Sequence, residues 1–457
     1  MARKQKWVSG LLVFSAALTG GAVAEEWDFS GSTAELGLGY LDEDAFRFGR
    51  FTGLTDKGVY VIGNADVEGW TDEGRLLRFD AADIGLSSRY LRLDYGEIAN
   101  YRLFLEYDGI PNNLFDTAQT PFVGSGGDIL ALPPDWDFGE TVDDMSRLDE
   151  SLRPFKIETE RRKTTAGARW QFAEPWTLDV KVSHETKDGT DILGAATGAG
   201  FGTGVGSVTS SILPMPVDYT TDQVEVKLGY AKGRGNLELA YYYSGFDNKD
   251  DSLTWQNPFA SVSDTGVLRT SEVGAMALPP DNDFHRFALS GGYRLGDTTR
   301  LSGALSWGRM SQNQAFEPIT VNPALDVTDG MPRQDLGDAD IADVFLRLAS
   351  RPLERTNVRA TYRYHERDDD FDAMTYSYVV ADSRPGGEVT TDPLKYQRHD
   401  FDLGGDYRFN DITLLSLDYA YERMNRDYEA AERKKTDENA LYAQLRFDVH
   451  SDVQFTL

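Results

Sequence analysis

The sequence contains no cysteine among its 457 residues. This absence excludes disulfides, thiolate metal sites and the C-x-x-C-H motif that attaches haem covalently. Cations are also scarce, because 46 Lys and Arg stand against 75 Asp and Glu, and the formal net charge is −29. Such a surface repels nucleic acid and anionic lipid. If the protein serves redox chemistry, it carries no thiol-attached redox centre of its own.

Long apolar runs are missing as well, and no segment approaches the ~20 apolar residues of a transmembrane helix. The mean hydropathy of −0.45 is too polar for a helical membrane protein. Near the start, an uncharged stretch at residues 8–18 follows three cations and precedes the small residues 22–24. This pattern predicts a cleaved signal peptide, residues 1–24, and a mature chain, residues 25–457. A secreted, helix-poor chain can span a membrane only as a closed β-barrel.

What the sequence does contain is a hairpin unit repeated five times. Each unit has two strands of alternating apolar and polar residues joined by a short polar turn, followed by a long acidic loop. The first apolar positions of the five units are Ala166, Val224, Phe287, Val344 and Phe401. Because the period is two, one strand face is apolar and meets lipid, while the other is polar and meets water. A soluble β-sandwich also alternates, but its strands are nearer six residues long than ten.

The fold that we predict is all-β: a transmembrane antiparallel up-and-down β-barrel of about 16–17 strands, with short periplasmic turns and long extracellular loops. The expected strands lie near residues 33–41, 58–69, 74–81, 88–96, 101–108, 156–172, 176–187, 221–231, 235–247, 285–295, 299–310, 341–349, 355–366, 397–408, 412–424 and 437–449. A further alternating run starts at Val453. Because bacterial barrels normally have an even strand count, we expect a C-terminally incomplete chain that is part of a larger barrel.

The connections between strands are asymmetric and fix the orientation. Short turns at residues 173–175, 232–235, 296–298, 350–354 and 409–411 alternate with long loops near residues 188–220, 248–284, 311–340 and 367–396. Acidic groups in these loops, at residues 247–251 and 368–370, suit either a loop calcium ion or a solvated surface. Residues 109–155 lack strand signal, and we expect a long loop or a plug-like connection there, with its side of the membrane left open.

Charged residues on the polar strand faces are the candidate functional residues. The set that we predict to face the lumen is Arg286, Arg294, Arg300, Arg359, Arg363, Glu225 and Lys227. An enzyme would need a histidine beside an acid or a hydroxyl, and only His184, with Glu185 and Asp188 nearby, is worth testing. We expect the histidines to lie in the interfacial girdle or at loop bases, and we predict no catalytic, cofactor-binding or metal site.

Several irregular stretches resemble one family of barrels. They are RFGRFTGLTDKGVY at residues 47–60, EYDGIPNNLFDTAQTPFVG at 106–124, LPPDW at 132–136, HETKDGT at 184–190, DYTTDQVEV at 218–226 and SLTWQNPF at 252–259. In this order they resemble the MtrB/PioB family of decahaem-associated outer-membrane proteins. Some relatives carry a C-x-x-C pair near the mature N-terminus, which this sequence lacks.

The resemblance implies an integral protein of the bacterial outer membrane that sheathes and positions a periplasmic multihaem (decahaem) c-type cytochrome. Electrons would then cross the outer membrane for metal reduction or iron oxidation, with all haem supplied by the partner. An outer-surface multihaem cytochrome is a further partner implied in this way. A barrel of sixteen to eighteen strands is, however, the size of a porin, so a general diffusion porin or substrate channel is the alternative function.

Overall fold

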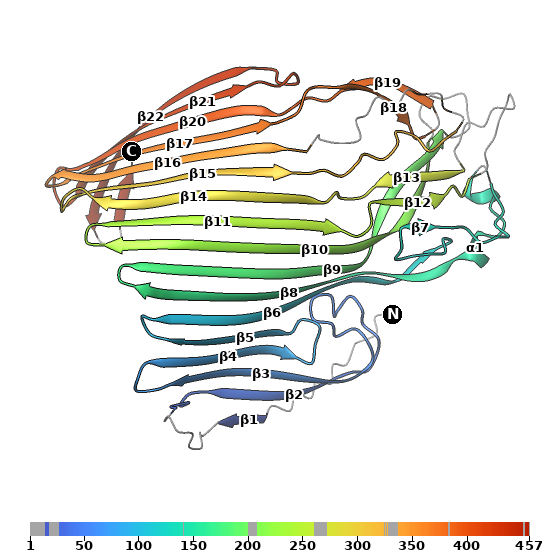
Figure 1. The fold of residues 1–457 in the computed structure, drawn as a ribbon, viewed down its shortest axis with the longest axis horizontal. Helices are drawn as coiled ribbons and strands as arrows, with labels where there is room; N and C mark the ends of the chain where they lie inside the picture. Colours follow the sequence, from blue (N-terminus) through green and yellow to red (C-terminus); the bar gives the residue numbers. More distant parts are fainter. Residues whose placement is uncertain are drawn as a thin grey trace.

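The structure is a computed structural model, and it describes residues 14–17, 27–139, 141–199, 208–259, 272–323, 325, 327, 337–382, 384–450 and 453–456. Most of the described chain is β-strand, and one antiparallel sheet dominates it (Figure 1). The strands of this sheet are β1 (Phe14–Ala17), β2 (Thr33–Leu41), β3 (Gly58–Trp70), β4 (Arg75–Ile84), β5 (Tyr90–Glu97), β6 (Tyr101–Thr120), β8 (Arg153–Ala173), β9 (Trp176–Ala199), β10 (Val208–Lys232), β11 (Gly235–Asn248), β14 (Asn282–Arg294), β15 (Thr299–Ser311), β16 (Ala339–Leu353), β17 (Thr356–Asp369), β20 (Lys395–Arg408), β21 (Thr413–Arg426), β22 (Lys435–His450) and β23 (Val453–Thr456).

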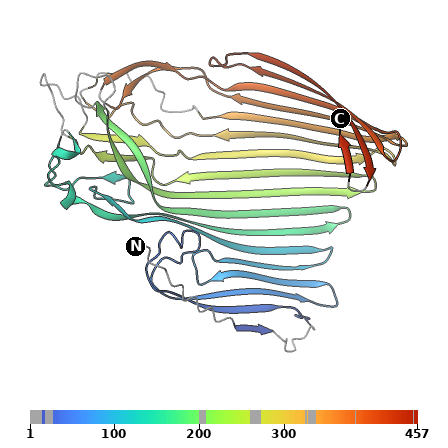
Figure 2. The same ribbon diagram turned by 180° about the vertical axis from the view of Figure 1, so that it is seen from behind.

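The sheet has the up-and-down order that the sequence predicts. It contains 18 strands, and from β2 onward each strand pairs antiparallel with the next strand of the sheet. The predicted all-β class is therefore confirmed, and without β1 the sheet has 17 strands, in agreement with the predicted 16–17. Figures 1 and 2 show the sheet curling so that β22 and β23 turn behind the neighbouring strands. Among the described strands no pairing joins β23 to β2, so the barrel is not closed in this structure.

At its other edge the sheet begins with β1, which lies inside the predicted signal peptide. Residues Phe14–Ala17 pair with the first four residues of β2. The cleavage site and the larger barrel stay predictions.

One face of the sheet is apolar and exposed. Leu239, Leu289 and Leu305 lie directly opposite one another on β11, β14 and β15, and their exposed fractions are 51%, 38% and 48%. A continuous exposed face of this kind is stable only in contact with another apolar medium. The alternation in the sequence therefore builds a lipid-facing surface, as in other transmembrane barrels.

The five short turns that the sequence predicts between the repeated hairpin strands lie at one end of the sheet (Figure 1). The local sequence explains several of them. Gly233 supplies a φ of +60° between β10 and β11, a conformation that glycine adopts without strain. Asn410 accepts hydrogen bonds from the backbone N–H groups of Ile412 and Thr413 at 3.0 and 2.8 Å, which closes the turn between β20 and β21. The turn that the sequence predicts at residues 350–354 lies at residues 354–355, because β16 continues to Leu353 and β17 begins at Thr356.

At the opposite end several strands run far beyond the membrane. β6, β8, β9 and β10 contain 20, 21, 24 and 25 residues, whereas about 9–11 residues cross a bilayer. The prediction that residues 109–155 lack strands and that 188–220 form a loop is therefore wrong in part. Register shifts between Asn113 and Ala118 break the two-residue period, which hid this part of β6 from sequence reasoning.

The long connection after β6 folds into a compact unit that we call the loop cap, residues 121–139, 141–152, 252–256 and 273–277. It contains β7 (Ile129–Leu130), β12 (Ser252–Gln256) and β13 (Val273–Ala277), which form a three-stranded sheet. A 3₁₀ helix η1 (Val142–Asp144) and a short helix α1 (Leu148–Ser151) complete it. The cap lies at the long-loop end of the sheet (Figure 1), which is the end that we predict to be extracellular.

A small hydrophobic core holds the loop cap to the strands. Leu130, Leu253 and Trp255 from the cap pack with Leu213 of β10, and all four are at most 2% exposed. Trp136 donates its Nε1 hydrogen to the carbonyl of Pro258 at 3.0 Å. The described part of the segment 248–284, which the sequence predicts to be a loop, thus supplies the paired strands β12 and β13 and two core residues, Leu253 and Trp255. Neither helix of the described chain has the length or the apolar content to cross a membrane.

A second paired element, β18 (Thr375–Val380) with β19 (Arg384–Thr390), projects from the loop at residues 367–396. Next to it, Asp392 joins two loops by accepting hydrogen bonds from the backbone N–H groups of Ala430 and Glu429, both at 2.6 Å. These bonds lower the pKa of Asp392 below its ordinary value of 3.8. The stabilisation is therefore fully present above that ordinary value and is lost as the pH falls through the lowered pKa.

We accordingly expect the amides of Glu429 and Ala430 to be protected from hydrogen exchange at about pH 6 and to lose protection at about pH 2, beyond the change in intrinsic rate. Asp392→Ala will remove the protection at both pH values, whereas Asp411→Ala, in a short turn at the other end, will leave it unchanged. Protection factors that are equal in wild type and Asp392→Ala would contradict the assignment.

Candidate functional site: the polar face of the sheet

The polar face of the sheet carries every candidate residue that the sequence predicts. Directly opposed residues of an antiparallel pair lie on the same face. Through the register, Glu225 lies opposite Tyr242, Tyr242 opposite Arg286, and Arg286 opposite Gly308. Continuing in this way across β10 to β17 places the whole set on one face: Arg286, Arg294, Arg300, Arg359, Arg363, Glu225 and Lys227. That this face lines a lumen stays a prediction, because the sheet is open.

Five of the seven candidates have polar side-chain partners. Their contacts are Lys227 Nζ to Glu225 Oε1 at 2.5 Å, Arg286 Nη2 to Ser306 Oγ at 3.0 Å, Arg359 Nη1 to Asp406 Oδ2 at 2.9 Å with Asp418 as a second partner, and Arg363 Nη1 to Asp402 Oδ2 at 2.8 Å. Most partners lie on a neighbouring strand of the same face. The charges are thereby held in fixed positions and largely compensate one another.

The most buried charge on this face was not a candidate from the sequence. Asp94 on β5 has a fully buried side chain between two arginines, with Arg92 Nε at 2.7 Å and Arg102 Nε at 2.9 Å. Arg92 also donates to Glu106 at 2.5 Å, and its guanidinium lies 4.5 Å from the ring centroid of Phe104. The signal was present, because the charged residues at positions 92, 94, 102 and 106 alternate with apolar residues.

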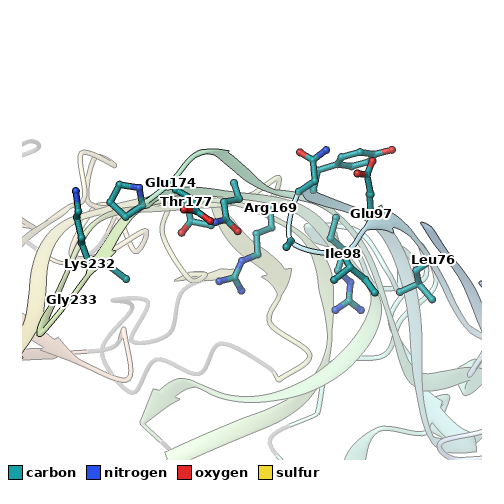
Figure 3. A pocket seen from close by; sticks show the side chains of 16 residues that line it. Leu76, Glu97, Ile98, Arg169, Glu174, Thr177, Lys232 and Gly233 are labelled. Atoms are coloured by element: carbon teal, nitrogen blue, oxygen red, sulfur yellow. The ribbon is translucent and has the colours of Figure 1, made fainter. Parts of the chain in front are cut away.

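A hollow of about 720 Å³ lies at the short-turn end, between the turns that follow β5, β8 and β10. Arg102 and Arg169 line it and lie directly opposite each other on β6 and β8. Figure 3 shows the side chain of Arg169 pointing to the other side from the amino group of Lys232 on the rim. Arg169 lies 3.7 Å from Asp179, and Arg102 is held by Asp94. The hollow therefore presents arginines that are partly compensated.

Three of the four histidines with described side chains, His285, His365 and His399, lie toward the long-loop ends of their strands, whereas His184 lies nearer the short-turn end of β9. His285 and His399 occupy equivalent positions, because each accepts or donates a hydrogen bond with a tyrosine hydroxyl, Tyr241 at 2.9 Å and Tyr362 at 3.0 Å. His365 contacts Asp343 at 2.7 Å on the polar face. That these histidines belong to an interfacial girdle or to loop bases stays a prediction.

In the described part of the chain, His184 forms the one histidine–acid pair on the apolar face. Its Nδ1 lies 2.7 Å from Asp222 Oδ1, and both side chains are 59% exposed. Among the described residues Asp222 is the hydrogen-bonding partner of His184, rather than the Glu185 or Asp188 that the sequence suggested. Glu185 and Asp188 instead contact arginines of β8, Arg161 and Arg162.

The acidic loop groups lie beside cations of the same chain. Asp368 contacts Lys395 at 2.7 Å, and Asp370 contacts Arg309 at 3.2 Å. In the part of the chain that the structure describes, no three or more His, Asp or Glu side chains group as a metal site would require.

Comparison with known proteins shows which family this sequence matches. The sequence profile described as "Putative outer membrane beta-barrel porin, MtrB/PioB" matches residues 40–457, which is most of the chain. The chain belongs to the MtrB/PioB family. As a member of this family it is an integral β-barrel protein of the bacterial outer membrane, in agreement with the all-β sheet, its apolar face and the predicted export signal.

One curated relative of this MtrB/PioB protein is "Outer membrane protein MtrB" of Shewanella baltica (strain OS185), 28% identical over 419 residues. The match covers 91% of this chain and 56% of the relative, so the chain spans little more than half the length of that protein. Solved structures with some likeness include the copper transporter OprC, with 12% identity, coverage of 93% and 68%, and a TM-score of 0.37. The siderophore receptor PiuA from Acinetobacter baumannii has 10% identity, coverage of 98% and 71%, and the same TM-score.

Proposed function

We propose that this MtrB/PioB protein forms the wall of a barrel that sheathes and positions a multihaem c-type cytochrome for electron transfer across the outer membrane. The observation that carries the proposal is the pair of unlike faces on one sheet. The apolar face suits lipid, and the polar face holds arginines and carboxylates in fixed ion pairs. Hydrocarbon cannot host a polar protein surface, because each unsatisfied polar group there costs several kcal/mol.

The chemistry of the polar face also supports a barrel that encloses the cytochrome while the cytochrome carries the haems. A preorganised, mostly compensated polar wall contacts a folded protein without leaving buried charges unpaired. The chain has no cysteine to attach haem, so every haem would belong to the partner. The barrel would then insulate the cytochrome and fix its position, while the electrons pass through the haems of the partner. The direction of electron flow depends on the redox partners.

A diffusion channel is the second candidate, and one observation favours it. Arg300 and Arg347 on the polar face have no side-chain partner among the described residues. Free arginines in a lumen would give a channel a preference for anions. The two functions therefore predict different behaviour of the isolated protein.

Purification from the native membrane in mild detergent separates these functions. We expect a multihaem c-type cytochrome, detected by its haem absorbance, to co-purify in a fixed ratio with the barrel. The isolated barrel, reconstituted in planar bilayers, serves as the second assay. Absence of any c-type cytochrome together with steady anion-selective conductance would contradict the sheath and establish the channel.

A further inference from the structure

A second hollow, of about 440 Å³, lies at the short-turn end and is lined by four arginines of β14 to β17. Arg294 on β14 and Arg300 on β15 lie directly opposite each other on the polar face. Arg351 and Arg359 line the same hollow from β16 and β17. Like charges placed directly opposite each other across two strands destabilise a sheet. A compensating anion would relieve this repulsion, and we call this site the arginine hollow.

The compensation that other arginines of the polar face receive is missing here. Arg363 lies 2.8 Å from Asp402, and Arg398 lies 3.1 Å from Asp400. Among the residues that the structure describes, neither Arg294 nor Arg300 has a side-chain partner, and the Nε of Arg351 donates to a neutral amide, Asn357 Oδ1, at 3.2 Å.

The carboxylates around the arginine hollow do not fill this gap. The hollow has one carboxylate in its lining, Asp297, which is 93% exposed and lies 3.5 Å from Arg234, at the preceding turn. Arg359 already binds Asp406 and Asp418. The whole chain has 75 acidic residues against 46 basic ones. A group of uncompensated cations in so acidic a chain is a local feature and not a consequence of composition.

We infer that the arginine hollow, through Arg294, Arg300 and Arg351, docks a carboxylate-rich segment on the surface of the protein that the barrel encloses. This inference rests on the proposed function. Guanidinium groups bind carboxylates through two parallel hydrogen bonds, which fixes orientation as well as affinity. The hollow lies at the short-turn end, which faces the periplasm in outer-membrane barrels. A contact there would fix how far the enclosed protein enters the barrel.

A protein segment is the occupant that the position favours over an anionic lipid. Arg294 and Arg300 lie on the polar face of the sheet. Their sequence neighbours Tyr293 and Leu301 lie on the other, lipid-facing side. A lipid headgroup would approach from the other side of the sheet. Among the described residues, the carboxylates near the hollow contact other arginines, Asp297 with Arg234 and Asp406 with Arg359.

The test compares the double variant Arg294→Gln/Arg300→Gln with a matched control, Arg355→Gln/Arg408→Gln. The control removes the same charge at the same end of the strands, where those arginines contact only backbone carbonyls. We expect the hollow variant to bind the cytochrome about tenfold more weakly at low salt and to show a weaker salt dependence than wild type. The control should bind like wild type. Equal affinity and salt dependence in the hollow variant would overturn the inference and leave the sheath intact.

A probe that needs no cytochrome keeps the two proposals separable. A fluorescent hexaglutamate peptide is added to the purified full-length barrel, and binding is followed by anisotropy. We expect binding by wild type and the control, and loss of binding in the hollow variant. Binding that is lost in the hollow variant, in a protein that never co-purifies with a cytochrome, would support the hollow and refute the sheath. Variant-sensitive binding to phosphatidylglycerol vesicles and none to the peptide would overturn the inference.

Discussion

Replacing Asp94 by alanine will lower the free energy of unfolding by about 2–4 kcal/mol, because it leaves two arginines of the polar face without their shared carboxylate. The side chain of Asp94 is fully buried, whereas those of Arg92 and Arg102 are 25% and 52% exposed. Arg92 keeps Glu106, so the loss falls short of that for a wholly buried charge. Denaturant unfolding in lipid vesicles, followed by tryptophan fluorescence, measures the change.

The matched control for this variant is Asp402→Ala. Asp402 is also on the polar face and also pairs with an arginine, Arg363, but its side chain is 46% exposed. Its removal should cost only about 0–1 kcal/mol, because exposed ion pairs contribute little. If both variants lost the same stability, burial of the charge at Asp94 would not be the reason for its effect.

Replacing Leu289 by arginine will destabilise the folded barrel in lipid by about 2–4 kcal/mol, because the side chain lies mid-strand on the lipid-facing side. Its neighbours across the strands are Leu239 and Leu305, so the guanidinium finds no polar partner there. The free energy of unfolding in lipid vesicles is again the measurement.

The adjacent position gives a control that differs only in face. Ser290 lies on the polar face between Glu238 and Ala304. Ser290→Arg should change stability by less than about 1 kcal/mol, since surface substitutions at polar positions rarely cost more. A larger loss for Ser290→Arg than for Leu289→Arg would reverse the assignment of the two faces.

Sequence reasoning predicted the parts of the fold in which one strand face is uniformly apolar. The alternation through Phe287 and Leu289 and the turns at Gly233 and Asn410 are local signals, and local signals suffice for a hairpin. The strand register brings all seven candidate residues to a single face, and their lumen-facing position stays a prediction. Arg92 and Asp94 follow the same alternation, but they lie outside the five repeated hairpins that contain all seven candidates.

The remaining features depend on contacts between distant residues. Bulges between Asn113 and Ala118 interrupt the period of β6, so its second half looked like a loop. The loop cap forms because Leu130 and Trp255, more than a hundred residues apart in the sequence, share one core. The arginine hollow is defined by missing carboxylates, and whether an arginine has a partner on another strand becomes visible only once the register is known.

The most direct test of the sheath is electron transfer across a sealed bilayer. Vesicles that contain both the barrel and its co-purified cytochrome enclose a soluble electron acceptor, and a membrane-impermeant reductant is added outside. The sheath predicts rapid reduction of the enclosed acceptor with both proteins present and none with either protein alone. Reduction at the same rate without the barrel, or no reduction with both proteins, would contradict it.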